Sequence, residues 1–391
     1  MNFVYFLLVL IFLFFATIFI VDFFTEFISR AKRYRIGRWS NEKEWKSAVE
    51  NRCIKWLNKT PTVKQTDNNR YILFDMLNKK HKNSTIQSWQ MAGLLLGLYE
   101  CNTNISDKAI ISWKNKMLSD EGDWKNKINK VDSALLAYAC LKCFGSEKIK
   151  PAMDFVIKII ESNLCQDGMI SYSQGKNSSI RFVDTLGMVC PFLALYAQKY
   201  NQPKYLKLAF DQVSKFREKG MLNPTQLPCH AFDSANRLPL GIYGWGRGTA
   251  WYIISLIEMY NSISDEKSKD KLKLLIKLAA DDYLKYQKSD GSFYTILQGA
   301  GQYDSSVTVI MAYFFQECYF IFNNENYLKA SKSALKKIMS VTMRNGAVDQ
   351  CQGDTHGIGI FSQVFDIMPF IQGILLKTIK RNETYLNEKN I

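Results

Sequence analysis

In Asp167-Gly168-Met169, a glycine follows a helical stretch and a hydrophobic residue follows the glycine. The same short turn recurs along the chain as Glu121-Gly122-Asp123-Trp124, Lys219-Gly220-Met221, Asp290-Gly291-Ser292-Phe293 and Asn345-Gly346-Ala347. In chain order these glycines are 46, 52, 71 and 55 residues apart. A recurring unit of that length indicates a repeat architecture, in which neighbouring units bury their apolar faces against each other.

The segments between these turns carry apolar residues at helical spacing, with almost no alternating β pattern. Candidate helices begin near residues 43, 86, 106, 131, 148, 182, 203, 247, 267, 306, 326 and 361. Most form pairs of one apolar-rich and one more amphipathic helix. Twelve helices in six pairs predict an all-α fold, a closed (α/α)6 barrel in which the helix at 43–58 pairs with the one at 361–379. Loops at one end of such a barrel line a cleft, where functional residues gather.

The N-terminal segment predicts a membrane anchor. The stretch from Phe3 to Val21 carries no charge, and as a helix it would rise about 28 Å, enough to cross a bilayer core of about 30 Å. No positive region precedes it and no small-residue cleavage site follows, so an uncleaved anchor fits better than a signal peptide. The flank is basic, with Arg30, Lys32, Arg33, Arg35 and Arg38. We therefore expect a single-pass protein of the bacterial inner membrane whose large domain faces the cytoplasm.

Three parts follow along the chain. We expect a transmembrane anchor at 1–24, a basic juxtamembrane segment with the first helix at 25–84, and the barrel as the catalytic domain at 85–391, which the helix at 43–58 completes.

Composition narrows the class of partner. The chain has 391 residues, of which 47% are hydrophobic, so it can build a large core. The formal charge of +15 comes from lysines scattered along presumed helices, and no nucleic-acid motif is present. We expect no nucleic acid as partner and a mild preference for anionic substrates. The nine cysteines match no zinc pattern and indicate buried free thiols in a reducing compartment.

Two aspartates stand where apolar helices begin. Asp132 opens one such helix, and Asp184 lies in Arg181-Phe182-Val183-Asp184-Thr185-Leu186-Gly187-Met188. Helix capping would explain either residue. An acid held among apolar groups would also have its charged form disfavoured and its pKa raised, which is what a general acid at neutral pH requires.

The densest polar and aromatic segment is Gly241-Ile242-Tyr243-Gly244-Trp245-Gly246-Arg247-Gly248-Thr249-Ala250-Trp251, preceded by His230. Trp245 and Trp251 offer flat faces for sugar rings, and Arg247 offers a fork that could hold a carboxylate. A structural role is the alternative for His230.

A fourth segment, Tyr303-Asp304-Ser305-Ser306-Val307, starts another apolar helix with three polar groups, which a helix cap alone would explain. No His/Asp/Glu set has first-shell metal spacing, and no GxSxG turn of a serine hydrolase occurs. We expect no metal and no cofactor.

In this order the segments resemble the unsaturated glucuronyl and unsaturated rhamnogalacturonyl hydrolases, glycoside hydrolase families 88 and 105, over roughly residues 85 to 380. The markers are Val183-Asp184-Thr185-Leu186-Gly187-Met188 with Pro191-Phe192-Leu193, Trp245-Gly246-Arg247-Gly248, Tyr303-Asp304-Ser305-Ser306 and Pro369-Phe370-Ile371-Gln372-Gly373. The resemblance implies an (α/α)6 barrel. It also implies hydration of the C4=C5 double bond of a terminal unsaturated uronic acid on an oligosaccharide, after which the unstable hemiketal opens and releases the neighbouring sugar.

The resemblance further implies a role for each site residue. Asp184 would be the general acid/base that protonates C4 and takes a proton from the water attacking C5. Asp132 would be the second carboxylate, whose charge helps to keep Asp184 protonated. His230 would lie near the reacting ring, and Arg247 with Trp251 would line the substrate subsite. Asp304, Ser305 and Ser306 would form a polar segment at the rim of the substrate subsite and would bind the substrate.

The anchor and the segment from about 25 to 84 depart from the usual soluble enzymes of these families, and the stretch at 353–357 resembles their C-terminal loop only loosely. The source of the unsaturated sugar stays open among pectin, a glycosaminoglycan and a bacterial surface polysaccharide. Two other functions stay open. One is another α/α-barrel activity such as sugar epimerisation, which needs paired histidines from among His81, His230 and His356. The other is a membrane-bound glycan-binding or assembly protein without turnover.

Overall fold

The computed structural model describes residues 2–64, 72–77, 83–126, 128–172, 178–299 and 301–388. His81, one of the histidines considered for epimerisation, lies outside the described residues.

A ring of six mostly buried helices forms the inside of the described barrel. Each helix packs against the next in chain order and the last packs against the first, so the ring is closed. Because these helices are covered on every side, they are apolar around most of their circumference. They are α4 (Ser88–Tyr99), α6 (Ser133–Cys143), α8 (Asp184–Tyr200), α10 (Gly246–Tyr260), α12 (Ser305–Phe322) and α14 (Pro369–Glu388).

A second layer of helices covers this ring, and each packs against its inner partner along one apolar stripe. In α7, for example, Ala152, Val156 and Ile160 are buried at helical spacing while the opposite side faces solvent. The outer helices are α2 (Glu42–Asn58), α5 (Asn104–Met117), α7 (Lys150–Ser162), α9 (Pro203–Gly220), α11 (Glu266–Tyr283) and α13 (Glu325–Ser340). The predicted α/α barrel is therefore confirmed, and α2 takes the outer place beside α14.

The observed helices begin within two residues of the predicted positions, apart from the last. That helix was expected from about residue 361 and begins at Pro369, a residue suited to a first helical turn. The preceding residues instead form β8 (Phe365–Asp366), which pairs with β7 (Cys351–Gln352).

The repeated glycine turn joins four of the outer helices, α5, α7, α11 and α13, to the inner helix that follows each of them. Gly122, Gly168, Gly291 and Gly346 have φ angles of +86°, +73°, +86° and +85°, a conformation that favours glycine. At Gly346 a Cβ atom would lie 2.0 Å from the carbonyl oxygen of Ala48, in α2. This turn therefore packs the end of α13 directly against the first outer helix. Gly220 differs, because α9 runs on into β4 (Met221–Leu222) without such a turn.

A small antiparallel sheet lies between α9 and α10 and was absent from the sequence prediction. It consists of β3 (Ile180–Phe182), β5 (Leu227–Asp233), β4 and β6 (Leu238–Tyr243), with β5 paired to the other three. Most of β5 is buried on both faces, so its sequence shows no alternation of polar and apolar residues. Shorter elements are β1 (Thr62–Lys64), α3 (Ile72–Leu77), β2 (Asn83–Thr85) and the 3-10 turns Glu147–Ile149 and Leu284–Tyr286.

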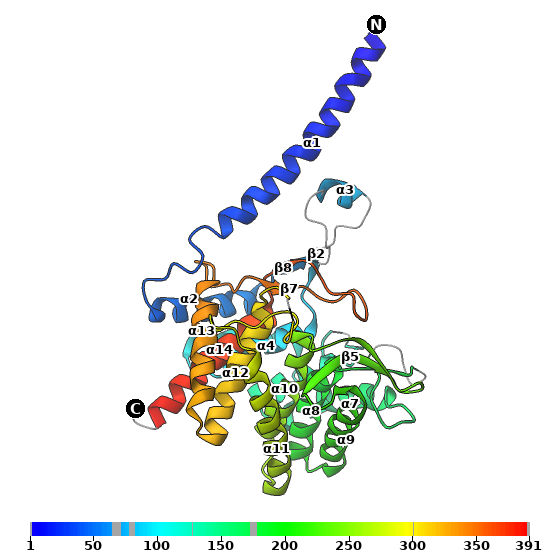
Figure 1. Ribbon diagram of the computed structural model, residues 1–391, viewed down its shortest axis with the longest axis vertical. Helices are drawn as coiled ribbons and strands as arrows, with labels where there is room; N and C mark the ends of the chain where they lie inside the picture. Colours follow the sequence, from blue (N-terminus) through cyan, green and yellow to red (C-terminus); the bar gives the residue numbers. More distant parts are fainter. Residues whose placement is uncertain are drawn as a thin grey trace.

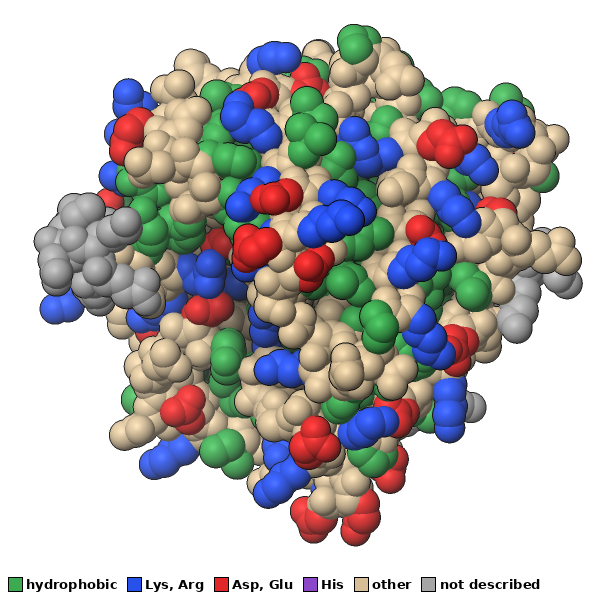
Figure 2. Space-filling model, turned by 90° about the horizontal axis from the view of Figure 1, so that it is seen from below, with side chains coloured by type: hydrophobic (Ala, Val, Ile, Leu, Met, Phe, Trp, Pro, Cys, Tyr) green, Lys and Arg blue, Asp and Glu red, His purple; other side chains and the backbone are tan. Residues whose placement is uncertain are grey.

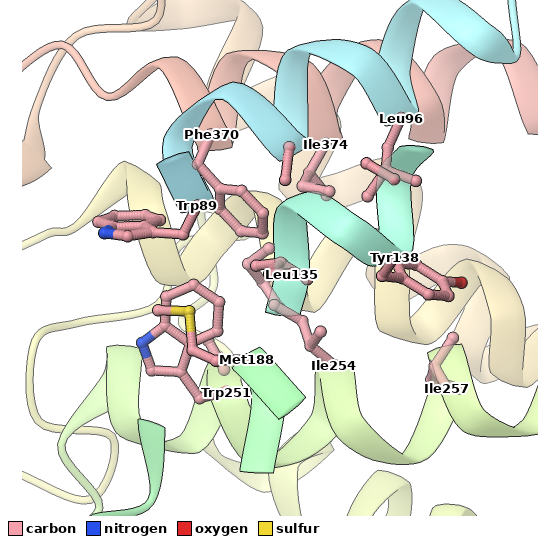
Figure 3. Close-up of a cluster of buried hydrophobic side chains, with 14 of the residues drawn as sticks. Trp89, Leu96, Leu135, Tyr138, Met188, Trp251, Ile254, Ile257, Phe370 and Ile374 are labelled. Atoms are coloured by element: carbon pink, nitrogen blue, oxygen red, sulfur yellow. The ribbon is translucent and has the colours of Figure 1, made fainter. Parts of the chain in front are cut away.

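The core runs through the middle of the inner ring (Figure 3). Trp89, Met188 and Trp251 gather toward one end of the cluster, and Tyr138 lies toward the other. At that other end Glu258 is buried against the ammonium group of Lys377. Although burial opposes ionisation, Lys377 holds the pKa of Glu258 at about 2.

Helix α1 (Asn2–Lys32) leaves the barrel, and helix α3 lies beside it (Figure 1). Its Phe, Leu, Ile and Val side chains are exposed along its length. Among the described residues, the segment Phe3–Lys32 and helix α12 are long and apolar enough to cross a membrane, but α12 is mostly buried in the barrel. Helix α1 is thus the candidate span, or a signal sequence.

Candidate active site

A cavity of about 510 Å³ opens at the end of the barrel where the inner helices begin. Its walls come from the first turns of α4, α8 and α10, from the residues that precede α6, and from the loop at 354–357. The predicted residues Asp132, Asp184, His230, Trp245, Arg247 and Trp251 all line this one cavity.

Asp184 is the first residue of α8 and is placed by the neighbouring sheet. The amide of Val183 donates to the carbonyl oxygen of His230, which ties the start of the helix to β5. The Asp184 side chain is 18% exposed, and its Oδ2 atom is buried without a hydrogen-bond partner. Burial raises the pKa of Asp184 to about 6, with Arg247 opposing and Asp354 adding to the rise. A group with this pKa can give and take a proton near neutral pH.

His230 projects from β5 toward Asp184, and its Nε2 lies 3.7 Å from Asp184 Oδ2. Burial and the charge of Arg247 lower the pKa of His230 to about 4, so the imidazole is neutral at pH 7. Its Nδ1 accepts a hydrogen bond of 3.3 Å from the amide of Gly359. The proton of the neutral ring therefore sits on Nε2, facing Asp184.

Asp132 lies immediately before α6 and is buried. Its Oδ2 is 3.4 Å from the hydroxyl of Tyr172, and its Oδ1 is buried without a hydrogen-bond partner. Burial raises the pKa of Asp132, Lys130 opposes the rise, and Asp354 adds to it. The family resemblance implied that the charge of Asp132 helps to keep Asp184 protonated. In the structure the neighbouring carboxylate that raises the pKa of Asp184 is Asp354.

Arg247 binds the loop opposite the two acids. Its guanidinium group donates to the backbone carbonyls of Gln352 and Gly353 and lies 5.3 Å above the ring of Trp245. Trp245 is buried and donates to the side-chain oxygen of Gln352 at 3.2 Å. These contacts fix the loop at 352–357 against the start of α10. Arg247 still lines the cavity and supplies positive charge to it.

Aromatic rings form much of the remaining wall. Trp251 packs edge-on against Trp89 with ring centroids 5.5 Å apart, and both line the cavity. The ring of His230 is packed among Phe182, Trp245 and Phe361. Such walls exclude water and suit the apolar faces of a sugar ring.

The remaining predicted group does not reach the cavity. Asp304, Ser305 and Ser306 are fully buried, and Asp304 caps α12 by accepting a 2.7 Å hydrogen bond from the amide of Ser306. Asp304 also accepts a 3.1 Å hydrogen bond from the amide of Gln352. This group therefore supports the loop that Arg247 holds, and the geometry gives no contact with a substrate.

Several cavity residues were missed by the sequence analysis. Asp354 belongs to the Gly-Asp-Thr-His-Gly stretch, whose spacing to the other acids along the chain carries no signal. His356 of the same stretch, considered above for epimerisation, also lines the cavity. Tyr172 precedes the residues at 173–177, which are not described, and Gln87 donates to Asp354 at 3.4 Å. Within the described ranges, no group of three or more His, Cys, Asp or Glu could hold a metal ion.

A closed α/α barrel with two buried acids of raised pKa in an aromatic cavity has the features expected of a carbohydrate-active enzyme. A family profile described as Glycosyl Hydrolase Family 88 matches residues 53–363, which is most of the chain. The chain belongs to this family. Among curated proteins, none matches it significantly.

Solved structures share the fold at low identity. A possible member of family GH105 from Klebsiella pneumoniae has a TM-score of 0.71 and 15% identity over 88% of this chain and 94% of that one. An unsaturated glucuronyl hydrolase specific for heparin has a TM-score of 0.62 and 13% identity over 90% and 99%. The unsaturated glucuronyl hydrolase from Bacillus sp. GL1, responsible for the degradation of glycosaminoglycan, has a TM-score of 0.60 and 16% identity over 87% and 95%.

Proposed function

We propose that this chain hydrates the C4=C5 double bond of a terminal unsaturated uronic acid on an oligosaccharide, with Asp184 as general acid/base. The observation that carries the proposal is the state of Asp184. A buried carboxyl oxygen without a partner, in a group with a pKa of about 6, faces a neutral His230 inside an aromatic cavity. Solved structures of the same fold include unsaturated glucuronyl hydrolases, which supports this substrate class.

The reaction balances with one water and one acid. Protonated Asp184 gives its proton to C4, and the oxygen of a water forms a bond to C5. The Asp184 carboxylate takes the proton that this water loses, so the acid is restored. The product is a hemiketal at C5; its bond to the ring oxygen breaks, and the hemiacetal left at C1 releases the neighbouring sugar as an alcohol.

His230 and Asp132 have separate parts in this scheme. The gap of 3.7 Å between His230 Nε2 and Asp184 Oδ2 is too long for a direct hydrogen bond, and the attacking water or a substrate hydroxyl can bridge it. One carboxylate oxygen of Asp132 is buried without a hydrogen-bond partner, and in this scheme it accepts a hydrogen bond from a hydroxyl group of the sugar. Lys130 and Arg247 supply the positive charge that a uronic acid carboxylate needs.

Helix α1 is part of the same proposal. Its exposed apolar stretch is long enough for one membrane crossing, and the basic residues that follow favour the cytoplasmic side for the barrel. The enzyme then works on oligosaccharides while held at a membrane.

The test follows the ultraviolet absorbance of the conjugated alkene in unsaturated disaccharides prepared with polysaccharide lyases. The full chain should remove this absorbance, and Asp184→Asn should reduce kcat by at least about 1000-fold. Asp270→Asn, an exposed acid on the outer helix α11, is the matched control and should keep full activity. Unchanged absorbance across pectin-derived and glycosaminoglycan-derived substrates would refute the proposal.

Product analysis separates the alternatives. His230 and His356 both line the cavity, so an epimerase would convert an intact sugar into its isomer without loss of a double bond. Tight glycan binding without any product, little affected by Asp184→Asn, would instead identify a binding protein.

A further inference from the structure

Helix α1 does not lead into a flexible linker, because the residues that follow it are bound to the barrel. Arg33 comes directly after α1 and donates to both oxygens of Asp349, whose side chain is fully buried. The same guanidinium lies 3.8 Å from Asp366. Because the guanidinium group makes two parallel hydrogen bonds to a buried carboxylate, it fixes the orientation of the residues after α1 relative to the barrel.

Further contacts continue this attachment toward α2. The amide of Gly37 donates to the carbonyl of Thr342 at 3.0 Å. Arg344 donates to the carbonyl of Arg38 at 2.9 Å and lies 4.5 Å above the ring of Trp39. The segment 33–39, which we call the clamp, is therefore seated on the loop that follows α13.

The clamp is seated at the end of the barrel where the cavity opens. Asp349 comes just before β7, and β7 leads into the loop at 352–357 that lines the cavity. Asp366 belongs to β8, the partner of β7. In Figure 1, α1 departs from the end that carries β2, β7 and β8. The opposite end, shown in Figure 2, carries Lys and Arg intermixed with Asp and Glu, as is usual for a surface in water.

Distances along α1 place this end near the lipid head groups. Residues 22–32 continue the helix for about 16 Å beyond the apolar stretch. Head groups occupy about 5–8 Å of that length. The remaining gap is on the order of 10 Å, which is the size of one or two sugar rings. Helix α3 lies beside α1 and exposes Met76 and Leu77, which suits the membrane interface.

We infer that the mouth of the cavity faces the membrane that α1 enters, and that the substrate sugar is carried on a lipid of that membrane. The inference rests on the proposed function and on α1 being an anchor. A cavity mouth that faces the bilayer does not raise the local concentration of a soluble oligosaccharide. A sugar carried on a lipid, in contrast, is present at this mouth at a high effective concentration. Exposed Lys130 at the mouth and the basic clamp attract acidic sugars and anionic head groups.

Orientation is tested first, without any need for turnover. One dye is placed at Ile360→Cys, an exposed position in the loop near the mouth, and in a second variant at Asn201→Cys, at the far end of α8. The two positions differ in depth by about 25 Å along the barrel. Most native cysteines are buried, and burial raises the pKa of the partly exposed Cys143, so labelling of the unmodified chain serves as the background control.

The full chain is reconstituted in vesicles of phosphatidylethanolamine and phosphatidylglycerol that carry an acceptor dye on their head groups. We expect several-fold stronger energy transfer from position 360 than from position 201. Equal transfer, or stronger transfer from position 201, overturns the inferred orientation.

The substrate is tested with one sugar in two forms. An unsaturated uronyl disaccharide is supplied in solution or coupled to a phospholipid in the same vesicles. We expect kcat/KM to be at least tenfold higher for the lipid-borne form in the full chain. A variant with a 20-residue Gly/Ser insertion after Lys32 keeps α1 and the contact between Arg33 and Asp349 but uncouples the barrel from the helix. It should lose that preference while hydrolysing the soluble disaccharide normally.

Equal kcat/KM for the soluble and the lipid-borne form in the full chain overturns the lipid-borne substrate while leaving the proposed function standing. A preference for the lipid-borne form that is equally strong in both proteins overturns the role of the fixed orientation. No turnover of either form by either protein overturns the proposed function and the inferred substrate together, and energy transfer still decides the orientation.

Discussion

At the scale of single residues, the chemistry of the site depends on the surroundings of Asp184 and His230, which determine the pKa values of the two side chains. Asp184 Oδ2 is buried and has no hydrogen bond to stabilise its charge, and His230 is buried near the positive charge of Arg247. Their pKa values of about 6 and about 4 are therefore displaced in opposite directions from the usual values, so that between about pH 4 and pH 6 a protonated Asp184 lies beside a neutral His230.

These two pKa values predict the pH dependence of activity. The reaction needs protonated Asp184, so kcat/KM should fall about tenfold per pH unit above about pH 6. It should also fall below about pH 4, where His230 becomes charged. The measurement is the initial rate of absorbance loss between pH 3.5 and 8.5, at about half-unit steps. A rate that stays level up to pH 8 contradicts this assignment of the acid.

The same raised pKa predicts that Asp184→Asn makes the protein more stable. In the folded protein the ionised Asp184 carboxylate is buried and loses contact with water, which makes ionisation unfavourable. The free energy of unfolding of the wild type therefore falls as pH rises from about 4 to about 6. At pH 8 the variant should gain on the order of 2 kcal/mol in the free energy of unfolding, and the gain should vanish below about pH 4. Denaturant unfolding at both pH values checks this. A variant that is equally stable at pH 8 contradicts it.

The sequence could identify Asp184 because an acid among Phe182, Leu186 and Met188 is unusual at a helix start. It could not identify Asp354, because Asp354 lies near Asp184 only through the course of the loop after α13, which local sequence does not determine. It also took Asp304 for a cavity residue, since a buried cap and a binding residue share the same local pattern.

At the scale of elements, the glycine turns determine how inner helices follow outer ones. Helix periodicity and these turns sufficed to predict the barrel and most helix starts, because both signals are local. Strand β5 could not be predicted, because it is covered on both sides and its sequence has no period of two. Yet β5 carries His230, so the sheet missed by sequence is the one that builds the site.

The turn at Gly346 provides a test of this role. Gly346→Ala should destabilise the protein by about 2–4 kcal/mol, because φ is +85° and the added Cβ would meet the Ala48 carbonyl at 2.0 Å. Gly145→Ala is the matched control, since its Cβ would have no atom within 4 Å. Chemical denaturation of both variants gives the comparison. A Gly346→Ala protein as stable as Gly145→Ala would show that the turn does not hold α13 against α2.

At the scale of the whole molecule, the clamp ties the anchor to the barrel through Asp349. This carboxylate is fully buried and receives both its hydrogen bonds from Arg33. A buried charge that loses its partner is strongly destabilising, whereas removal of both charges costs much less.

Arg33→Ala should therefore lower the free energy of unfolding by about 2–4 kcal/mol. The double variant Arg33→Ala with Asp349→Asn should recover most of that loss, because the orphaned charge is gone. Both are measured on the full chain in detergent micelles by thermal unfolding. Equal losses in the single and double variants contradict a role for the Arg33–Asp349 pair. A truncation that ends before Arg33 should keep the barrel stable, whereas one that removes the clamp should not.

The proposed reaction depends on a raised pKa of Asp184, about 6, so that the group can give and take a proton near that pH, and nuclear magnetic resonance can measure this pKa directly. Aspartate labelled with ¹³C at the carboxyl carbon is introduced into the full chain, and the Asp184 signal is assigned from its absence in Asp184→Asn. The account predicts a titration midpoint of about 6. A midpoint near 3.8, the ordinary value, would contradict it, because the cavity would then hold no acid able to protonate C4.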